Sequence, residues 1–233
     1  MFRHGCLPDP RSSSLLAPLG DIVAVFIYVS GVKALRQWHA GVLAEAVALL
    51  QRDVQAAAAE TGGYVVAQAE GSAVVVFAQP TTAVAWAVGC QERALQLPWP
   101  QALLEHEAGT EVRRDGRVVL RGLRLRVGLE GGPAIARVVP RTGRLDYTGR
   151  TLNRASRIAS KAGQGAVFAS ASLWARARAT ADSSLTGTRT PRFGHAGNND
   201  LPDVSELVGS GGQGQAGSQT RTWHARHATP STI

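Results

Sequence analysis

Residues 145–163 read LDYTGRTLNRASRIASKAG, and this stretch decides the fold that we expect. It opens with a short alternation of apolar and polar residues, which is typical of a β-strand. Gly149 follows that strand, and the next residues have helical periodicity until Gly163, which predicts a helix over residues 150–162. The stretch also collects an Asp, an Asn and several Arg, so it is either an ordinary polar helix start or part of a site that handles a triphosphate.

The rest of the chain supplies further elements on both sides of this stretch. Strands are expected at residues 22–29, 64–68, 73–77, 123–129, 134–139, 145–147 and 166–169. Further helices are expected at residues 32–59 and 80–96, with a last helical turn or two at 172–178. This order indicates an α+β, ferredoxin-like sandwich, in which a mostly antiparallel sheet has helices packed on one face.

The length of 233 residues suits one domain with a tail at each end. Residues 1–20 are rich in Pro and Ser and are expected to form a flexible arm. Residues 21–178 contain the predicted elements and form the domain. Residues 179–233 are rich in Gly, Ser, Thr and Gln and lack apolar periodicity, so we expect a disordered tail there.

The net charge of +8 is concentrated in one part of the chain. Residues 110–178 hold 15 Lys and Arg against 4 Asp and Glu, whereas residues 1–109 hold 6 against 9. This concentration indicates a phosphate ligand, nucleic acid or an acidic protein face as partner, although a solvated Arg-rich surface explains it equally well. A sheet that binds RNA needs aromatic residues for base stacking. Because the strands predicted within residues 118–139 have none, no nucleic acid partner is expected.

The cysteines and the apolar runs indicate where the protein works. Cys6 and Cys90 show no metal-binding or redox spacing, which fits a reducing compartment. The longest clean apolar run, residues 22–29, is too short to span a membrane. We therefore expect no membrane segment in this chain and a cytoplasmic location, either as a separate protein or as part of a larger membrane-attached one.

Two motifs of the chain resemble those of the class III nucleotidyl cyclases, the adenylate and guanylate cyclases. They are RVGLEGG at residues 126–132 and DYTGRTLNRASR at residues 146–157. The resemblance covers residues 22–170, and among the members of the family it is closest to the cyclase domains of green algae. It implies the α+β fold of a class III cyclase catalytic domain.

In enzymes of this family the ribose 3′-oxygen attacks the α-phosphate and pyrophosphate leaves. The resemblance gives Asp146 the role of reading the purine, and a carboxylate acceptor suits the amine of adenine, so ATP is expected in preference to GTP. It gives Asn153 the role of orienting the ribose and Arg157 that of contacting phosphate. Arg157 lies one helical turn after Asn153, so both project from the same face. Gln68 aligns with a base-reading Lys of the family and is the second substrate-binding candidate.

The resemblance also implies two Asp that hold Mg²⁺ or Mn²⁺, and this chain lacks both. Tyr28 stands at the first position and Ser72 at the second. A neutral phenol is a poor ligand beside the carboxylate oxygen that Mg²⁺ prefers. Glu70 is close in sequence, but one acid cannot replace two. No metal-binding residue is therefore predicted, and the metal is expected only through the ligands of a partner subunit.

A later catalytic Lys of the family also has no counterpart, because residues 179–233 contain no lysine. Sites in this family form between two subunits, so the chain resembles the base-reading half of a homo- or heterodimer that cyclises ATP or GTP. We expect a homodimer to be inactive and the enzyme to need a metal-competent partner. The alternative is a catalytically inactive cyclase-homology module that regulates a partner by dimerising.

Overall fold

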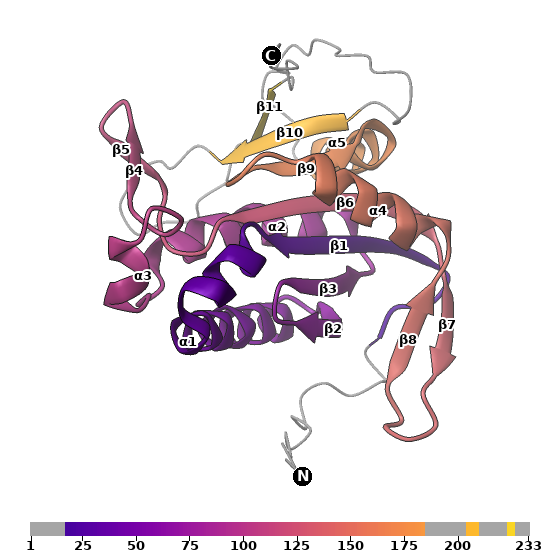
Figure 1. Ribbon diagram of the computed structural model, residues 1–233. Coiled ribbons are helices and arrows are strands. Elements are labelled where there is room, and N and C mark those ends of the chain that lie inside the picture. Colours follow the sequence, from indigo (N-terminus) through magenta and orange to yellow (C-terminus); the bar gives the residue numbers. More distant parts are fainter. Residues whose placement is uncertain (1–16, 185–203, 210–222, 227–233) are drawn as a thin grey trace.

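The computed structural model describes residues 17–184, 204–209 and 223–226, and it is built around one seven-stranded sheet (Figure 1). The strands lie in the order β11-β10-β9-β6-β1-β3-β2. Their bounds are β1 Asp21–Val29, β2 Tyr64–Ala69, β3 Ser72–Phe77, β6 Leu125–Pro133, β9 Val167–Ser170, β10 Val204–Gly209 and β11 Trp223–Arg226. The β6–β9 pair is parallel and the other neighbouring pairs are antiparallel, so the mostly antiparallel sheet is confirmed.

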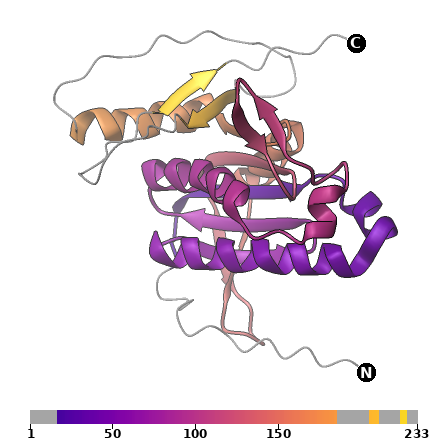
Figure 2. The same cartoon turned by 90° about the vertical axis from the view of Figure 1, so that its left-hand side faces the viewer.

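Helices cover both faces of this sheet. Their bounds are α1 Val32–Glu60, α2 Pro80–Gln96, α3 Gln101–Glu105, α4 Arg150–Lys161 and α5 Ala171–Ser184. Val23, Val25 and Ile27 of β1 share a core with α1, α2 and α5, and Figure 2 looks onto the layer that α1 and α2 form. Ile22 and Ala24 point the other way and pack with α4. The expectation of helices on one face is therefore corrected for α4, because an amphipathic pattern does not say which face of a sheet a helix covers.

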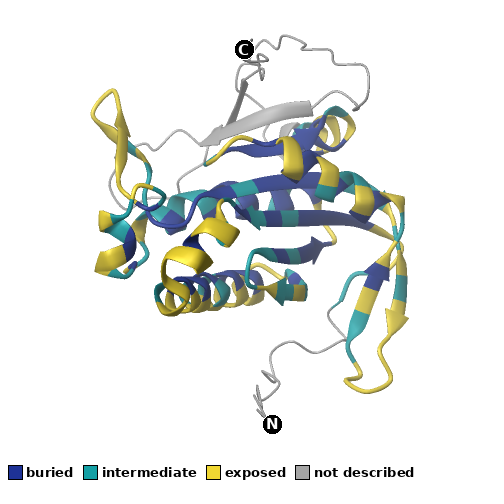
Figure 3. Cartoon of the chain, viewed as in Figure 1, coloured by how far each residue is buried: buried dark blue, intermediate teal, exposed yellow. Residues whose placement is uncertain are grey.

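Two hairpins extend from the body of the domain, and their tips are exposed (Figure 3). Their strands are β4 Val112–Arg114 with β5 Arg117–Leu120, and β7 Ile135–Val138 with β8 Leu145–Thr148. The β7–β8 hairpin exposes large apolar side chains: Ile135 is 58% and Val138 is 62% accessible to solvent. This hairpin therefore presents apolar side chains to solvent.

Residues 17–20, the last part of the expected flexible arm, lie against the base of the β7–β8 hairpin. The hydroxyl of Tyr147 donates to the carbonyl of Pro18 at 2.8 Å. The backbone amide of Ala134 donates to the carbonyl of Gly20 at 3.0 Å. The arm is therefore part of the fold at this end, while residues 1–16 lie outside the described residues.

The segment 179–233 also differs from the disordered tail that the sequence predicts. Helix α5 continues to Ser184, and β10 and β11 add two strands to the sheet beyond β9. Both strands are short and stand among Gly, Ser and Thr, so a composition argument over the whole segment does not detect them. The rest of the segment lies outside the described residues. In the described part of the chain, no helix combines the length and the apolar character that a membrane crossing requires.

Candidate functional site

The passage from β8 into α4 carries three of the predicted site residues. Asp146 lies on β8, and Asn153 and Arg157 lie on α4. All three residues are exposed. Gly149 joins the two elements with a φ of 134°, a conformation that glycine adopts far more easily than other residues. The short passage therefore presents a carboxylate, an amide and a guanidinium outward.

Helix α4 lies unusually close to the strand β6 beneath it. Its inner side is buried and includes Leu152, Ala155, Ile158 and Ala159. A Cβ atom added to Gly128 of β6 would stand 2.1 Å from the backbone nitrogen of Ala159. No side chain fits there. Gly128, the first glycine of the RVGLEGG motif, therefore allows the helix to pack directly against the sheet.

Two contacts between side chains, here called the flank ties, join α4 to the central strands, in addition to hydrogen bonds with backbone carbonyls such as that of Thr151 with Pro133. The hydroxyls of Tyr28 on β1 and Ser156 on α4 share a hydrogen bond of 2.7 Å. On β6, an oxygen of the Glu130 carboxylate lies 3.0 Å from Nε of Arg154. The site residues Asn153 and Arg157 are therefore borne by a helix that is tied to both β1 and β6.

Glu130 contacts the helix that bears Asn153 and Arg157, and it was not predicted from the sequence. It is 2% exposed, and its Oε1 accepts hydrogen bonds from the Ser170 hydroxyl at 2.7 Å and from the Gly131 amide at 3.0 Å. A buried carboxylate is costly unless it is paired, and Arg154 supplies the opposite charge. The signal in the sequence is a Glu within a strand whose other charged residue is Arg126, and it does not identify its partner.

The positions that the resemblance gives to metal ligands do not fit a metal ion. Tyr28 and Ser72 are directly opposed Cα partners on β1 and β3, but neither has a carboxylate. The nearby Glu70 carboxylate is already paired with the guanidinium of Arg36. Among the described residues there is also no cluster of three or more His, Cys, Asp or Glu that could hold a metal. This side of the site therefore offers neither the number nor the type of oxygen ligand that Mg²⁺ requires.

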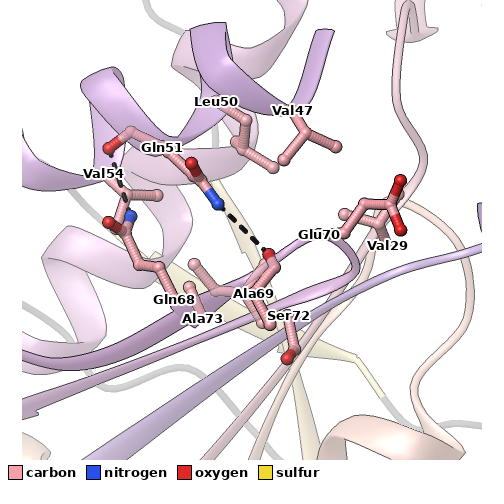
Figure 4. A pocket seen from close by; sticks show the side chains of 11 residues that line it. Val29, Val47, Leu50, Gln51, Val54, Gln68, Ala69, Glu70, Ser72 and Ala73 are labelled. Atoms are coloured by element: carbon pink, nitrogen blue, oxygen red, sulfur yellow. Dashed lines mark hydrogen bonds between the residues drawn. The ribbon is translucent and has the colours of Figure 1, made fainter. Parts of the chain in front are cut away.

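The structure places Gln68, the other substrate-binding candidate, on the face of the sheet that α1 covers. This residue is the register partner of Ala73, which belongs to the core under α1. Its side-chain amide donates to the carbonyl of Gln51 at 3.1 Å, and its Oε1 accepts from Gln55 at 2.8 Å. Figure 4 shows Gln68 pointing towards α1 beside the hollow that these residues line. Because α4 lies on the other face of the sheet, Gln68 and Asn153 are not brought together.

Asp146 is anchored by its neighbour Tyr147. Its Oδ1 accepts the backbone amide of Tyr147 at 2.9 Å. The Tyr147 ring is buried beside that of Tyr64, with 6.0 Å between the ring centroids. Burial, with a smaller contribution from Tyr64, raises the pKa of Tyr147 to about 12. Its phenol is therefore neutral at physiological pH and holds β8, with Asp146, against residues 17–20.

The sequence matches the family model described as the adenylate and guanylate cyclase catalytic domain over residues 17–189. It is 33% identical over 171 residues to an adenylate cyclase of Mycosarcoma maydis and 32% identical over 178 residues to one of Schizosaccharomyces pombe. These matches cover 70% and 72% of this chain but 7% and 10% of the two relatives. The chain thus spans at most a tenth of the length of these proteins. Both are fungal, and the likeness to green-algal domains stays a prediction.

Solved structures agree with the fold. The chain is similar to adenylate cyclases from Trypanosoma brucei in their monomeric state, with a TM-score of 0.67 and 24% identity. The match covers 83% of this chain and 92% of that one. The predicted class III cyclase type of α+β sandwich is confirmed.

Proposed function

Because the chain belongs to the family of adenylate and guanylate cyclase catalytic domains, we propose that it is the base-reading subunit of a dimeric class III cyclase. One contrast supports this role above all. Asn153 and Arg157 are exposed on a helix that is tied to the sheet, whereas Tyr28 and Ser72 provide no carboxylate for a metal. On this proposal the chain keeps the residues for ribose and phosphate and lacks the residues for the metal.

The proposed reaction is an internal phosphoryl transfer within a nucleoside triphosphate. The ribose 3′-oxygen forms a bond to the α-phosphorus, the bond from that phosphorus to the bridging oxygen of pyrophosphate breaks, and the 3′-hydroxyl proton leaves to solvent. Such transfers depend mainly on positioning and on stabilisation of developing charge. Asn153 would hold the ribose in the attacking orientation. Arg157 would stabilise the charge that gathers on the phosphate oxygens.

The substrate that we propose is ATP. The Asp146 carboxylate has only acceptor oxygens when ionised, and adenine offers an amine donor at its edge. The curated relatives in the two fungi are adenylate cyclases, which agrees with this choice. Guanine presents a carbonyl where adenine presents its amine, so a carboxylate there would repel GTP.

The missing half of the site would come from a second, non-identical cyclase domain. The exposed apolar side chains of the β7–β8 hairpin, Ile135 and Val138, suit contact with a partner. The same hairpin and the outer side of α4 are basic, with exposed Arg137, Arg150 and Lys161. In a twofold-symmetric homodimer these like charges would face a copy of the same surface. A partner that contributes carboxylates, and through them Mg²⁺ or Mn²⁺, avoids this repulsion.

The second candidate function is a catalytically inactive module that regulates a partner by dimerising. The same absence of carboxylates at Tyr28 and Ser72 favours it. It differs from the first proposal in one consequence: Asn153 and Arg157 would not contribute to turnover in any dimer.

A mixing experiment separates the two functions. The purified chain is incubated with Mn²⁺ and ATP, alone and together with a metal-competent cyclase domain whose own Asn and Arg equivalents have been replaced. Cyclic nucleotide formed only in the mixture, and lost with Asn153→Ala, is the expected result. Glu45→Ala, an exposed change on α1, is the matched control and leaves activity unchanged. Turnover by the lone chain, or none in the mixture, would overturn the proposal.

A further inference from the structure

The flank ties act on α4 from opposite sides. We propose that Tyr28 and Glu130 are positioning residues, which set the rotation of α4 about its axis through Ser156 and Arg154 and so aim Asn153 and Arg157. Their effect on catalysis rests on the proposed function, whereas their effect on α4 itself does not.

The helical geometry places the two ties symmetrically. Successive residues of an α-helix are about 100° apart around its axis. Relative to the buried Ala155, Arg154 therefore lies about 100° to one side and Ser156 about 100° to the other. Asn153 and Arg157 come close together on the far, exposed side. A rotation of α4 in either direction must lengthen one of the two ties.

The apolar contact beneath α4 limits such a rotation only away from its closest point, where the buried Leu152 and Ile158 pack on either side of it. At its closest point the helix rests on Gly128 through Ala155 and Ala159, whose backbone atoms lie nearest to that glycine. Small side chains make few interlocking contacts, and resistance to turning comes from side chains that interdigitate. The flank ties therefore act together with Leu152, Ile158 and the hydrogen bond of Thr151 to the Pro133 carbonyl, and they define the rotation at the level of Asn153 and Arg157.

Both ties are anchored on the central strands of the sheet. Tyr28 stands on β1, the strand between β3 and β6. Glu130 stands on β6, and its carboxylate is held from its other oxygen by Ser170 and Gly131. Neither anchor can follow α4 if the helix turns. Tyr28 thus has a new use in the position where the family places a metal ligand.

A turn of α4 would disturb only part of the site. Asn153 and Arg157 move with the helix, whereas Asp146 belongs to β8. Loss of a tie should therefore lower kcat, since ribose and phosphate are misplaced, and leave KM nearly unchanged, since the base contact stays. Misplacement of a reacting group by a fraction of an ångström to an ångström lowers the rate by about tenfold or more.

The test removes each tie without removing bulk. Tyr28→Phe deletes one hydroxyl, Glu130→Gln deletes one charge, and Ser156→Ala deletes the partner of Tyr28. Each variant is mixed with the metal-competent partner well below its melting temperature. We expect kcat to fall about tenfold with KM within about twofold. Ser156→Thr keeps a hydroxyl and should restore kcat in comparison with Ser156→Ala.

Two further measurements separate positioning from mere stability. Leu103→Ala removes the buried side chain of α3 from the main core. It should lower the melting temperature and leave kcat unchanged at a temperature where the variant is folded. Hydrogen exchange of the α4 amides, measured without nucleotide, should become faster in the Tyr28 and Glu130 variants and not in Leu103→Ala. If the parent mixture is inactive, the proposed function fails and the exchange data still decide this inference. Unchanged α4 exchange, or equal kcat losses in all variants, overturns it.

Discussion

Tyr28 on β1 lies directly opposite Ser72 on β3 in the antiparallel register of the central sheet. Directly opposed residues have Cβ atoms about 5 Å apart, so two carboxylates at these positions could share one metal ion. The phenol and the hydroxyl present cannot do so, and Glu70 is engaged by Arg36. The sheet thus provides the spacing that two ligands of one metal ion would need, without the carboxylates.

Restoring both carboxylates should restore metal binding. In the double variant Tyr28→Asp and Ser72→Asp, we expect Mn²⁺ to bind at micromolar to millimolar concentration, because hard oxygen ligands are again opposed across one strand pair. Electron paramagnetic resonance of free Mn²⁺ measures the bound fraction. Ser72→Asp alone is the control and should bind at least about tenfold more weakly, since it supplies one new ligand. Equal Mn²⁺ binding by the parent chain would show that the present residues suffice.

Replacing Asp146 by Ala should weaken the use of ATP. A hydrogen bond to a charged acceptor contributes about 1.5–3 kcal/mol, which corresponds to a loss of about tenfold to a hundredfold in kcat/KM in the mixed dimer. GTP turnover should fall less, so the ratio of the two rates measures the selectivity that Asp146 provides. Thr148→Ala, an exposed change on the same strand, is the control. An unchanged ratio would remove Asp146 from base recognition.

Much of the fold could be predicted because each central element has a clear period. The apolar run of β1 and the helical spacing of α4 identify their elements directly. The face that α4 covers could not be predicted, since it depends on the approach that Gly128 permits. The bend of α1 at His39, with φ −158° and ψ 94°, lies within a continuous helical pattern and leaves no signal in it.

The candidate site could be predicted only where its residues are close in sequence. Asp146, Asn153 and Arg157 belong to one motif, and in the structure all three are exposed along the passage from β8 into α4. The ion pair of Glu130 with Arg154 joins separate elements and could not be found from spacing. The face that Gln68 occupies could not be predicted either, because β2 has a register shift between Val65 and Ala67 and such a shift changes which face later residues occupy.

Replacing Gly128 by Ala should destabilise the domain. The added Cβ would meet the backbone of Ala159 at 2.1 Å, and backbone cannot move aside as a flexible side chain can. Overpacking of this kind costs about 1–3 kcal/mol or more in the free energy of unfolding. Gly163→Ala is the matched control, because its Cβ would meet only the Ala166 side chain at 3.9 Å. Urea denaturation of both variants tests the difference, and equal stability would contradict the close contact.

Because the pKa of Tyr147 is raised, the free energy of unfolding should fall at alkaline pH. The phenol has a pKa of 10.0 when unperturbed and about 12 in the folded protein, so folding favours its neutral form. The contribution of the neutral phenol to the free energy of unfolding is complete below pH 10, and it is lost as the pH rises through 12. The parent chain should therefore lose more unfolding free energy than Tyr147→Phe between pH 9 and pH 12. Parallel pH profiles for the two proteins would show that the phenol is not protected by burial.

The projecting β7–β8 hairpin should carry much of the affinity for the partner subunit. Replacing Ile135 and Val138 by Ser removes two exposed apolar side chains while leaving the strand pairing intact. Loss of the apolar area that each buries on association should weaken binding by about tenfold or more for the pair. Analytical ultracentrifugation of the mixture measures the dissociation constant, and circular dichroism verifies the fold. Val112→Ser with Val119→Ser makes the same change on the β4–β5 hairpin and should leave the constant unchanged. If the two double variants weaken association equally, exposed apolar area in general, and not this hairpin, mediates the contact.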